Sequence, residues 1–131
     1  MDGASRGNPG PASYGVCILK ENGQGLIEFS EYLGEATNSV AEYRALIRGL
    51  EEAQKLGAQE LDIFTDSQLV ARQFAGIYKV KHEGLKKIMA HVRQLEKNFR
   101  QVRVTHIPRS SHLANVRADR LANIALNRAG M

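Results

Sequence analysis

The sequence predicts an α/β protein with a mixed central sheet flanked by helices. Short apolar segments with strand character alternate with amphipathic segments of helical period along the 131 residues. An Asn-Gly turn signal at residues 22–23 joins two early strands, which makes the first part of the sheet antiparallel. The later strands alternate with helices, as is typical of parallel neighbours. The length suits one domain, so we expect residues 1–131 to form a single domain.

The expected elements follow in order along the chain. A glycine-rich opening at residues 3–15 leads into hairpin strands at 14–19 and 26–33, and residues 34–38 are predicted to be a loop. Apolar side chains recur at helical spacing over residues 39–56, and Gly57 is placed to end that helix. The remaining predictions are a strand at 61–65, a short helix at 67–74, an amphipathic helix at 85–99, a strand at 102–107, a loop at 108–113 and a helix at 115–128. We expect Cys17 and His106 to be packed inside their strands.

Composition and charge narrow the class of protein. The single cysteine excludes an intramolecular disulfide, and 43% hydrophobic residues are enough for a core without one. The first residues lack the apolar segment of a signal peptide, and no apolar run approaches the ~20 residues of a membrane span. We therefore expect a soluble, cytoplasmic monomer with no membrane partner. The net charge of +4 favours a polyanionic partner, and the more basic half is residues 67–131, whose only carboxylates are Glu83, Glu96 and Asp119.

Four carboxylates are candidates for chemistry. Asp2 begins the glycine-rich opening, Asp66 follows a short predicted strand, and Asp119 lies in the last predicted helix. Strand ends are where an open α/β sheet usually places its site. Glu42 lies one turn into the first long helix, where the segment Ser-Val-Ala-Glu also fits a capping box, and from this segment alone we favour the cap. Asp66 has a similar alternative role as the N-cap of the next helix. For Asp2 and Asp119 the alternative is an ordinary solvated side chain.

Four segments carry a resemblance to a known family. They are Asp2-Gly-Ala-Ser-Arg-Gly-Asn-Pro-Gly, Thr37-Asn-x-x-Ala-Glu42-Tyr, Thr65-Asp66-Ser-Gln-Leu-Val and Asn115-x-x-Ala-Asp119-x-Leu-Ala. In this order and spacing they resemble the motifs of type 1 ribonuclease H over essentially the whole chain. The resemblance implies a ribonuclease H-like fold. It also implies an endoribonuclease that hydrolyses the RNA strand of RNA–DNA hybrids and leaves 5′-phosphate products.

The resemblance further implies a metal centre. Asp2, Glu42, Asp66 and Asp119 would be the catalytic carboxylates and would hold two Mg²⁺ ions with substrate, Mn²⁺ being a substitute. Mg²⁺ prefers oxygen ligands. Two such ions roughly 4 Å apart can activate a water and stabilise the leaving 3′ oxygen. Clustered carboxylates repel one another, so we expect metal binding to stabilise the fold.

Other residues match family positions around the substrate. Asn8, Asn38 and Gln68 match positions that contact the hybrid, and amides suit this task because they both donate and accept hydrogen bonds. Their ordinary alternatives are a turn residue, a helix-start residue and a solvated side chain. The family's loop histidine aligns with Arg109, which can hold a phosphate but cannot shuttle protons near neutral pH. His112 is the second candidate for that catalytic role, with an exposed loop residue as its alternative.

Two features depart from the family. Only Met1 precedes Asp2, whereas relatives carry several strand residues there. We favour the explanation that the true start of the protein lies upstream, because a sheet lacking part of a strand leaves backbone groups unpaired. One alternative is that another segment or a second chain takes the place of the missing strand residues. The other is that the site is distorted. Residues 76–84 are short and the chain has no tryptophan, so the basic extension of some relatives is absent. We expect weaker, salt-dependent binding of the hybrid, with part of the charge supplied by Lys79, Lys81, Lys86 and Lys87.

Three further functions stay open on the sequence alone. One is a broader nuclease that also cuts double-stranded RNA. A second is a non-catalytic nucleic-acid-binding module of the same fold, which the short start favours and the presence of all four acids disfavours. A third is a phosphate-binding protein that uses the glycine-rich opening, but no Gly-Lys-Ser/Thr follows, which disfavours a P-loop.

Overall fold

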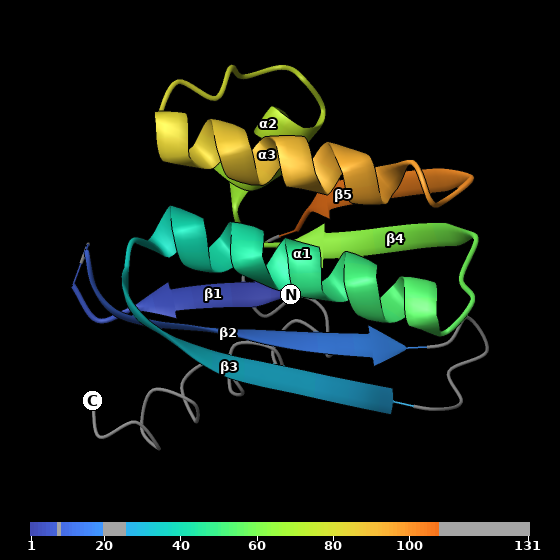
Figure 1. Ribbon diagram of the computed structural model, residues 1–131, viewed down its shortest axis with the longest axis horizontal. Coiled ribbons are helices and arrows are strands. Elements are labelled where there is room, and N and C mark those ends of the chain that lie inside the picture. The colour runs from blue at the N-terminus through green and yellow to red at the C-terminus, as the bar shows by residue number, and fades with distance from the viewer. Residues whose placement is uncertain (8, 20–25, 108–131) are drawn as a thin grey trace.

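The computed structural model describes residues 1–7, 9–19 and 26–107. Within them, five strands and three helices follow one another along the chain (Figure 1). Their bounds are β1 Asp2–Ser5, β2 Gly10–Leu19, β3 Leu26–Ala36, α1 Asn38–Lys55, β4 Glu60–Thr65, α2 Gln68–Phe74, α3 Glu83–Glu96 and β5 Gln101–His106.

The strands form an antiparallel group and a parallel group. β2 pairs antiparallel with β1 on one side and with β3 on the other, whereas β4 and β5 pair in parallel from Glu60↔Gln101 to Thr65↔His106. The Met1 amino group donates a hydrogen bond of 3.3 Å to the carbonyl of Phe64, near the end of β4. β1 therefore starts beside the end of β4 (Figure 1). The predicted mixture of early antiparallel and later parallel strands is confirmed.

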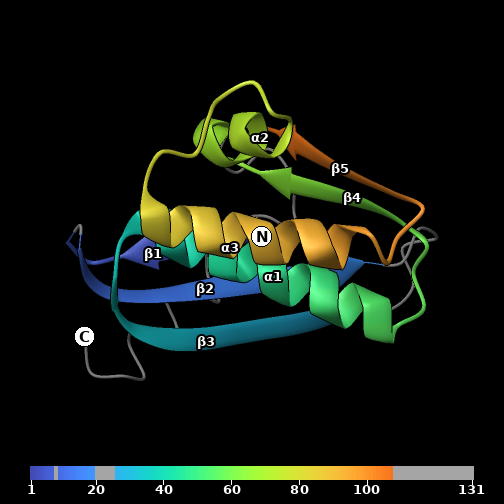
Figure 2. The ribbon, with the colours of Figure 1, turned by 45° about the horizontal axis from the view of Figure 1, so that its top comes forward.

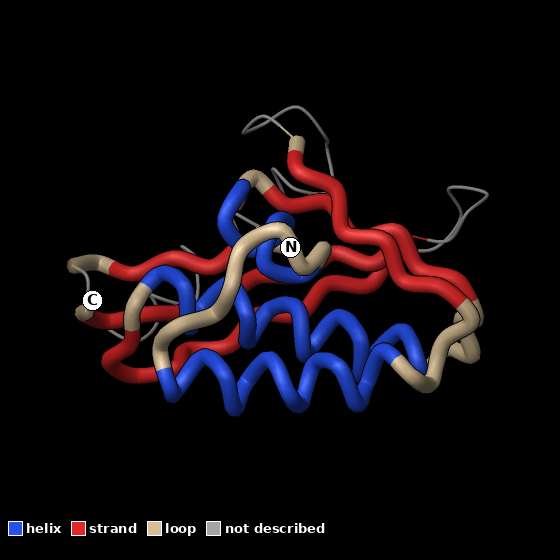
Figure 3. The backbone as a smooth tube through the Cα atoms, turned by 90° about the horizontal axis from the view of Figure 1, so that it is seen from above, coloured by secondary structure: helices blue, strands red, loops and turns tan. Residues whose placement is uncertain are grey.

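The helices form a layer over the strands. α1 packs against β1 and β2 and also against α3, and the tube view shows these two helices side by side on one face (Figures 2 and 3). Tyr43, Leu46 and Leu50 of α1 are fully buried, as is Val92 of α3. The three residues of α1 lie at the helical spacing from which this helix was predicted. The apolar stripe of α1 therefore faces the sheet and forms the centre of the core.

Most predicted elements are present, with shifts at their ends. β2 and β3 form the expected hairpin, although its turn lies outside the described residues, and α1 ends before Gly57, whose φ of 79° suits a residue without a side chain. The predicted loop at 34–38 was wrong, because β3 runs to Ala36 through Gly34 at positive φ, opposite a register shift in β2. The expected loop at 108–113 and helix at 115–128 lie outside the described residues.

Two predicted burial states differ from the structure. Cys17 is only half-buried, and His106 is exposed rather than packed, since it is the last residue of β5.

Among the described helices, none combines the length and the hydropathy that crossing a bilayer requires. The cytoplasmic location and the monomeric state stay predictions from the sequence.

Candidate metal centre

Three carboxylates from three separate elements meet where the two groups of strands approach each other. Asp2 is the first residue of β1, Glu42 lies in the second turn of α1, and Asp66 directly follows β4. Each offers an oxygen that lies within 4.8 Å of the oxygens of the other two. Asp2 is buried, and the other two side chains are half-buried. Residues separated by up to 64 positions in the chain thus form one compact acidic cluster.

The close approach of β1 to α1 depends on Gly3. A Cβ atom at this position would lie 2.3 Å from the backbone nitrogen of Glu42 and 2.5 Å from the carbonyl carbon of Ala41. Such distances are far below van der Waals contact, so only glycine lets the strand pass this close to the helix backbone. Asp2 and Glu42 are neighbours in space for that reason.

Asp66 is left free to face the cluster because its neighbours form the turn into α2. The hydroxyl of Thr65 accepts a hydrogen bond of 3.1 Å from the backbone N–H of Ser67, and the hydroxyl of Ser67 accepts one of 3.2 Å from the N–H of Val70. Ser67 is therefore the N-cap of α2. The alternative role of Asp66 as the cap was wrong.

Glu42 is likewise not used to cap its helix. α1 begins one residue earlier than predicted, and its N-cap is Thr37, whose hydroxyl accepts a hydrogen bond of 3.2 Å from the N–H of Val40. The capping box ending at Glu42 was therefore wrong. Any of three consecutive polar residues, Thr37 to Ser39, fits a helix start in sequence, and only the structure selects the first. The Glu42 carboxyl instead takes a hydrogen bond from the Ser67 hydroxyl.

The electrostatics of the cluster favour a bound cation. Burial raises the pKa of the Glu42 carboxyl to about 7, the hydrogen bond from Ser67 works in the opposite direction, and the charge of Asp66 adds to the increase. Three ionised carboxylates this close repel one another, and a divalent cation removes the repulsion. All the ligand atoms are hard oxygens, which suits Mg²⁺ or Mn²⁺ better than a metal that selects sulfur or imidazole. The residues present therefore fit a divalent metal.

The structure describes only some of the other residues singled out in the sequence. Asn38 is the first residue of α1, one turn before Glu42, and Gln68 is the first residue of α2, two residues after Asp66. Both are exposed and flank the cluster along the chain. Four remaining candidates lie outside the described residues: Asn8, Arg109, His112 and Asp119.

Two supporting contacts escaped the sequence reasoning. One is Ser67, which caps α2 and reaches Glu42. The other joins α1 to α2: the buried hydroxyl of Tyr43 donates a hydrogen bond to the side-chain oxygen of Gln73. A serine two residues after a strand end is a cap signal that could have been used. Tyr43 matched the apolar stripe and gave no sign of a polar partner.

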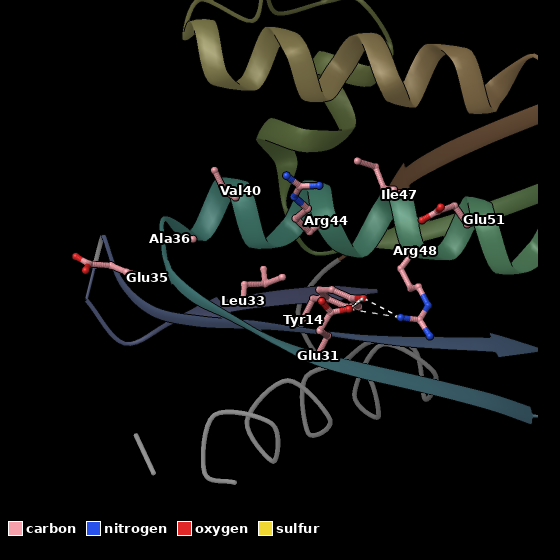
Figure 4. Close-up of a pocket in the computed structure, with 10 residues that line it drawn as sticks. All are labelled: Tyr14, Glu31, Leu33, Glu35, Ala36, Val40, Arg44, Ile47, Arg48 and Glu51. Carbon is pink, nitrogen blue, oxygen red and sulfur yellow. Dashed lines mark hydrogen bonds and ion pairs between the residues drawn. The ribbon is translucent and has the colours of Figure 1, made fainter. Parts of the chain in front are cut away.

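A separate concavity of about 390 Å³ lies between α1 and β3 (Figure 4). Glu31 and Arg48, two of the charged residues that line it, are 3.5 Å apart and both interact with the hydroxyl of Tyr14. None of the three clustered carboxylates lines it, nor do Asn38 and Gln68. Because the clustered carboxylates can hold a cation and this concavity lacks them, we place the candidate site at the cluster.

An antiparallel group and a parallel group of strands under a layer of helices, with acids converging from β1, α1 and the end of β4, define a protein of the ribonuclease H-like class. The family model described as reverse transcriptase-like matches residues 1–125. A bifunctional protein of Mycobacterium tuberculosis is 46% identical over 98% of this chain, and ribonuclease HI of Halobacterium salinarum is 41% identical over 98%. The solved structure of LC11-RNase H1 in complex with an RNA/DNA hybrid has a TM-score of 0.90 at 44% identity, covering 99% of this chain and 96% of that one.

The chain therefore belongs to the ribonuclease H family. It spans 35% of the length of the mycobacterial protein and 63% of that of the halobacterial enzyme.

Proposed function

We propose that this chain is a metal-dependent endoribonuclease that hydrolyses the RNA strand of RNA–DNA hybrids. The observation that carries the proposal is the convergence of Asp2, Glu42 and Asp66 from three elements into one cluster. Membership of the ribonuclease H family supports it, as does the structural similarity to a relative solved with an RNA/DNA hybrid.

In this proposal the clustered acids, together with Asp119, hold two Mg²⁺ ions, and Mn²⁺ can substitute. When bound, the ions supply a more acidic attacking water and charge stabilisation at the leaving 3′ oxygen. The protein's part is to orient its carboxylates: Asp2 is fixed by burial in β1, Glu42 by α1 and Ser67, and Asp66 by the turn into α2. The products carry 5′ phosphates.

The amide side chains flanking the cluster are the proposed contacts to the hybrid. Asn38 and Gln68 are exposed beside the acids, and Asn8 is assigned to the same role from the family motif. Their amides can donate hydrogen bonds to phosphates, and they can both donate to and accept from a 2′-hydroxyl. The 2′-hydroxyl is the group that distinguishes RNA from DNA. Proton transfer or phosphate binding by Arg109 or His112 stays a prediction from the sequence.

The test is cleavage of a labelled RNA–DNA hybrid, with RNA–RNA and DNA–DNA duplexes alongside, in Mg²⁺, in Mn²⁺ and in EDTA. We expect metal-dependent cutting of the RNA strand in the hybrid. Asp66→Asn should lower the rate by more than the roughly 10- to 100-fold that loss of an outer-shell partner costs, with folding retained. Full activity in excess EDTA, or an unchanged rate in Asp66→Asn, would refute the proposal, and cutting of RNA–RNA would identify the broader nuclease.

A further inference from the structure

The two peptide groups on either side of Asp66 are both anchored by hydrogen bonds. The carbonyl of Thr65 accepts a hydrogen bond of 2.9 Å from the backbone N–H of Ile107, directly after β5. The backbone N–H of Ser67 donates one of 3.1 Å to the side-chain hydroxyl of Thr65. Thr65 therefore takes part in both bonds, through its carbonyl on one side of Asp66 and through its hydroxyl on the other.

These anchors restrain the direction in which the Asp66 side chain leaves the backbone. Peptide groups are planar, so the soft backbone rotations at Asp66 are φ and ψ, which relate the two anchored groups to each other. Holding both groups restrains these two angles, and with them the direction of the Cα–Cβ bond. An aspartate side chain adds only two further rotations, so its carboxylate stays close to the place that the backbone assigns.

The two anchors differ in what they require from the sequence. The bond from Ile107 continues the backbone pairing of β4 with β5 and needs no particular side chain. The bond from Ser67 needs a side-chain acceptor at residue 65, because a serine or threonine hydroxyl can bond the N–H two residues on and form a turn. Thr65 is only 1% exposed, so water has little access to its hydroxyl.

We propose that Thr65 is a positioning residue whose hydroxyl holds the Asp66 carboxylate toward Asp2 and Glu42. The inference rests on the proposed function, in which Asp66 is a metal ligand. A carboxylate oxygen of Asp66 lies within 4.8 Å of oxygens of the other two acids, although like charges favour its rotation away from them. A turn that resists this rotation prepares the site before the cation arrives, so binding has a smaller ordering cost to overcome.

The competing explanation is that Thr65 only fills the core and pairs a backbone donor. Substitutions at residue 65 would then change the stability of the protein, and the metal affinity would not depend on the hydroxyl. Valine keeps the shape of threonine without the hydroxyl, whereas serine keeps the hydroxyl without the methyl group. Serine and alanine differ only in the hydroxyl, so they give a second comparison that does not depend on the folding of the valine variant.

The experiment measures Mn²⁺ affinity by titration calorimetry on the full, metal-free chain, with thermal unfolding of each variant alongside. We expect Thr65→Val and Thr65→Ala to weaken Mn²⁺ binding roughly tenfold, as loss of a partner of a metal ligand does. Thr65→Ser should melt at a lower temperature, because it leaves a small cavity, but bind Mn²⁺ within about twofold of wild type. Thr105→Val is the matched control, because Thr105 is exposed on β5 opposite Phe64, and it should bind Mn²⁺ as the wild type does.

The outcomes that would overturn the inference are distinguishable from failure of the proposed function. If wild type binds Mn²⁺ and Asp66→Asn loses that binding while Thr65→Val and Thr65→Ala bind normally, the positioning role alone is wrong. Binding by Thr65→Ser as weak as that of Thr65→Ala would assign the effect to packing and would also refute the role of the hydroxyl. If the wild type binds no Mn²⁺, the proposed metal site is wrong and the role of Thr65 falls with it.

Discussion

The single hydrogen of the Gly3 side chain decides how closely Asp2 approaches Glu42. The backbone of β1 passes α1 at a distance that leaves no room for a methyl group, since a Cβ would lie 2.3 Å from the Glu42 nitrogen. The atoms it would meet belong to the helix backbone and cannot rotate away as a side chain can. β1 or α1 would have to move, and each carries one of the clustered acids.

Gly3→Ala should therefore destabilise the protein on the order of 1–3 kcal/mol and weaken metal binding. Gly49→Ala is the matched control, because its Cβ would meet only a side-chain atom of Val16 at 3.8 Å. Within the interior of α1, that change should stabilise the protein by about 1 kcal/mol. Chemical denaturation of both variants checks the prediction, and equal effects of the same sign would contradict it.

The raised pKa of Glu42 links the stability of the metal-free protein to pH. Its folded pKa of about 7 lies above the ordinary value of 4.5, because the buried carboxyl prefers to be neutral. The folded state then holds a proton that the unfolded state releases. This contribution to stability is complete below about pH 4.5 and is lost as the pH rises through 7.

In EDTA, raising the pH from 6 to 8 should therefore lower the free energy of unfolding by about 1 kcal/mol. Denaturant titrations at both pH values provide the measurement. Glu42→Gln should flatten this difference, since an amide does not titrate. A wild-type difference that survives unchanged in Glu42→Gln would assign the effect to another group.

Between elements, the orientation of α1 relative to α2 depends on one buried hydrogen bond. Tyr43 is fully buried and donates to Gln73, which is also buried. Burial raises the pKa of Tyr43 to about 12, with the Glu42 charge adding to the increase, so the hydroxyl stays protonated and available as a donor. Arg93 of α3 binds the same C-terminal end of α2, donating to the carbonyl of Phe74 at 2.6 Å.

Tyr43→Phe should cost about 1–3 kcal/mol of stability, because the Gln73 oxygen is left buried without its donor. Tyr32→Phe, on the exposed surface of β3, is the control and should be nearly neutral. Adding Gln73→Leu to Tyr43→Phe should recover part of the loss, since no polar atom then remains unsatisfied. A double-mutant cycle by thermal unfolding measures the coupling, and strictly additive losses would exclude the buried bond as its source.

The bounds of a helix or strand could be predicted from the sequence where its apolar periodicity ended at a residue that typically ends such an element. α1 was predictable because Leu46 and Leu50 continue an apolar stripe that ends before Gly57. The end of β3 was not, because Gly34 resembles a loop residue and its place in a bulged strand depends on pairing with β2.

The acidic cluster was predictable from motifs rather than from local physics. Taken alone, the segment around Glu42 favoured a cap, and only its similarity to a family pattern pointed to the metal role. The contacts that hold the acids were out of reach for a physical reason. The Gly3 approach and the Ser67 bond join residues 39 and 25 positions apart, and sequence periodicity reports only on neighbours within one element.

In the molecule as a whole, the candidate metal centre lies at the junction of two groups of strands. Asp2 belongs to the antiparallel group β1-β2-β3, whereas Asp66 follows β4 of the parallel pair. Met1, directly before β1, donates a backbone hydrogen bond to the carbonyl of Phe64 in β4. A cation held by both acids would join the two groups at this point, and without it their charges repel across the same junction.

Metal binding should therefore raise the stability of the whole molecule. Mg²⁺ or Mn²⁺ at about 100 times its dissociation constant should add about 2.7 kcal/mol to the free energy of unfolding. Asp66→Asn should lose most of this gain and should itself be more stable than wild type in EDTA, because the substitution removes one of the repelling charges. Asp62→Asn is the matched control: Asp62 lies on β4 but is exposed and paired with Arg103 at 2.6 Å. That variant should keep the full response to metal, and a metal-induced shift that survives in Asp66→Asn, or disappears in Asp62→Asn, would locate the cation elsewhere.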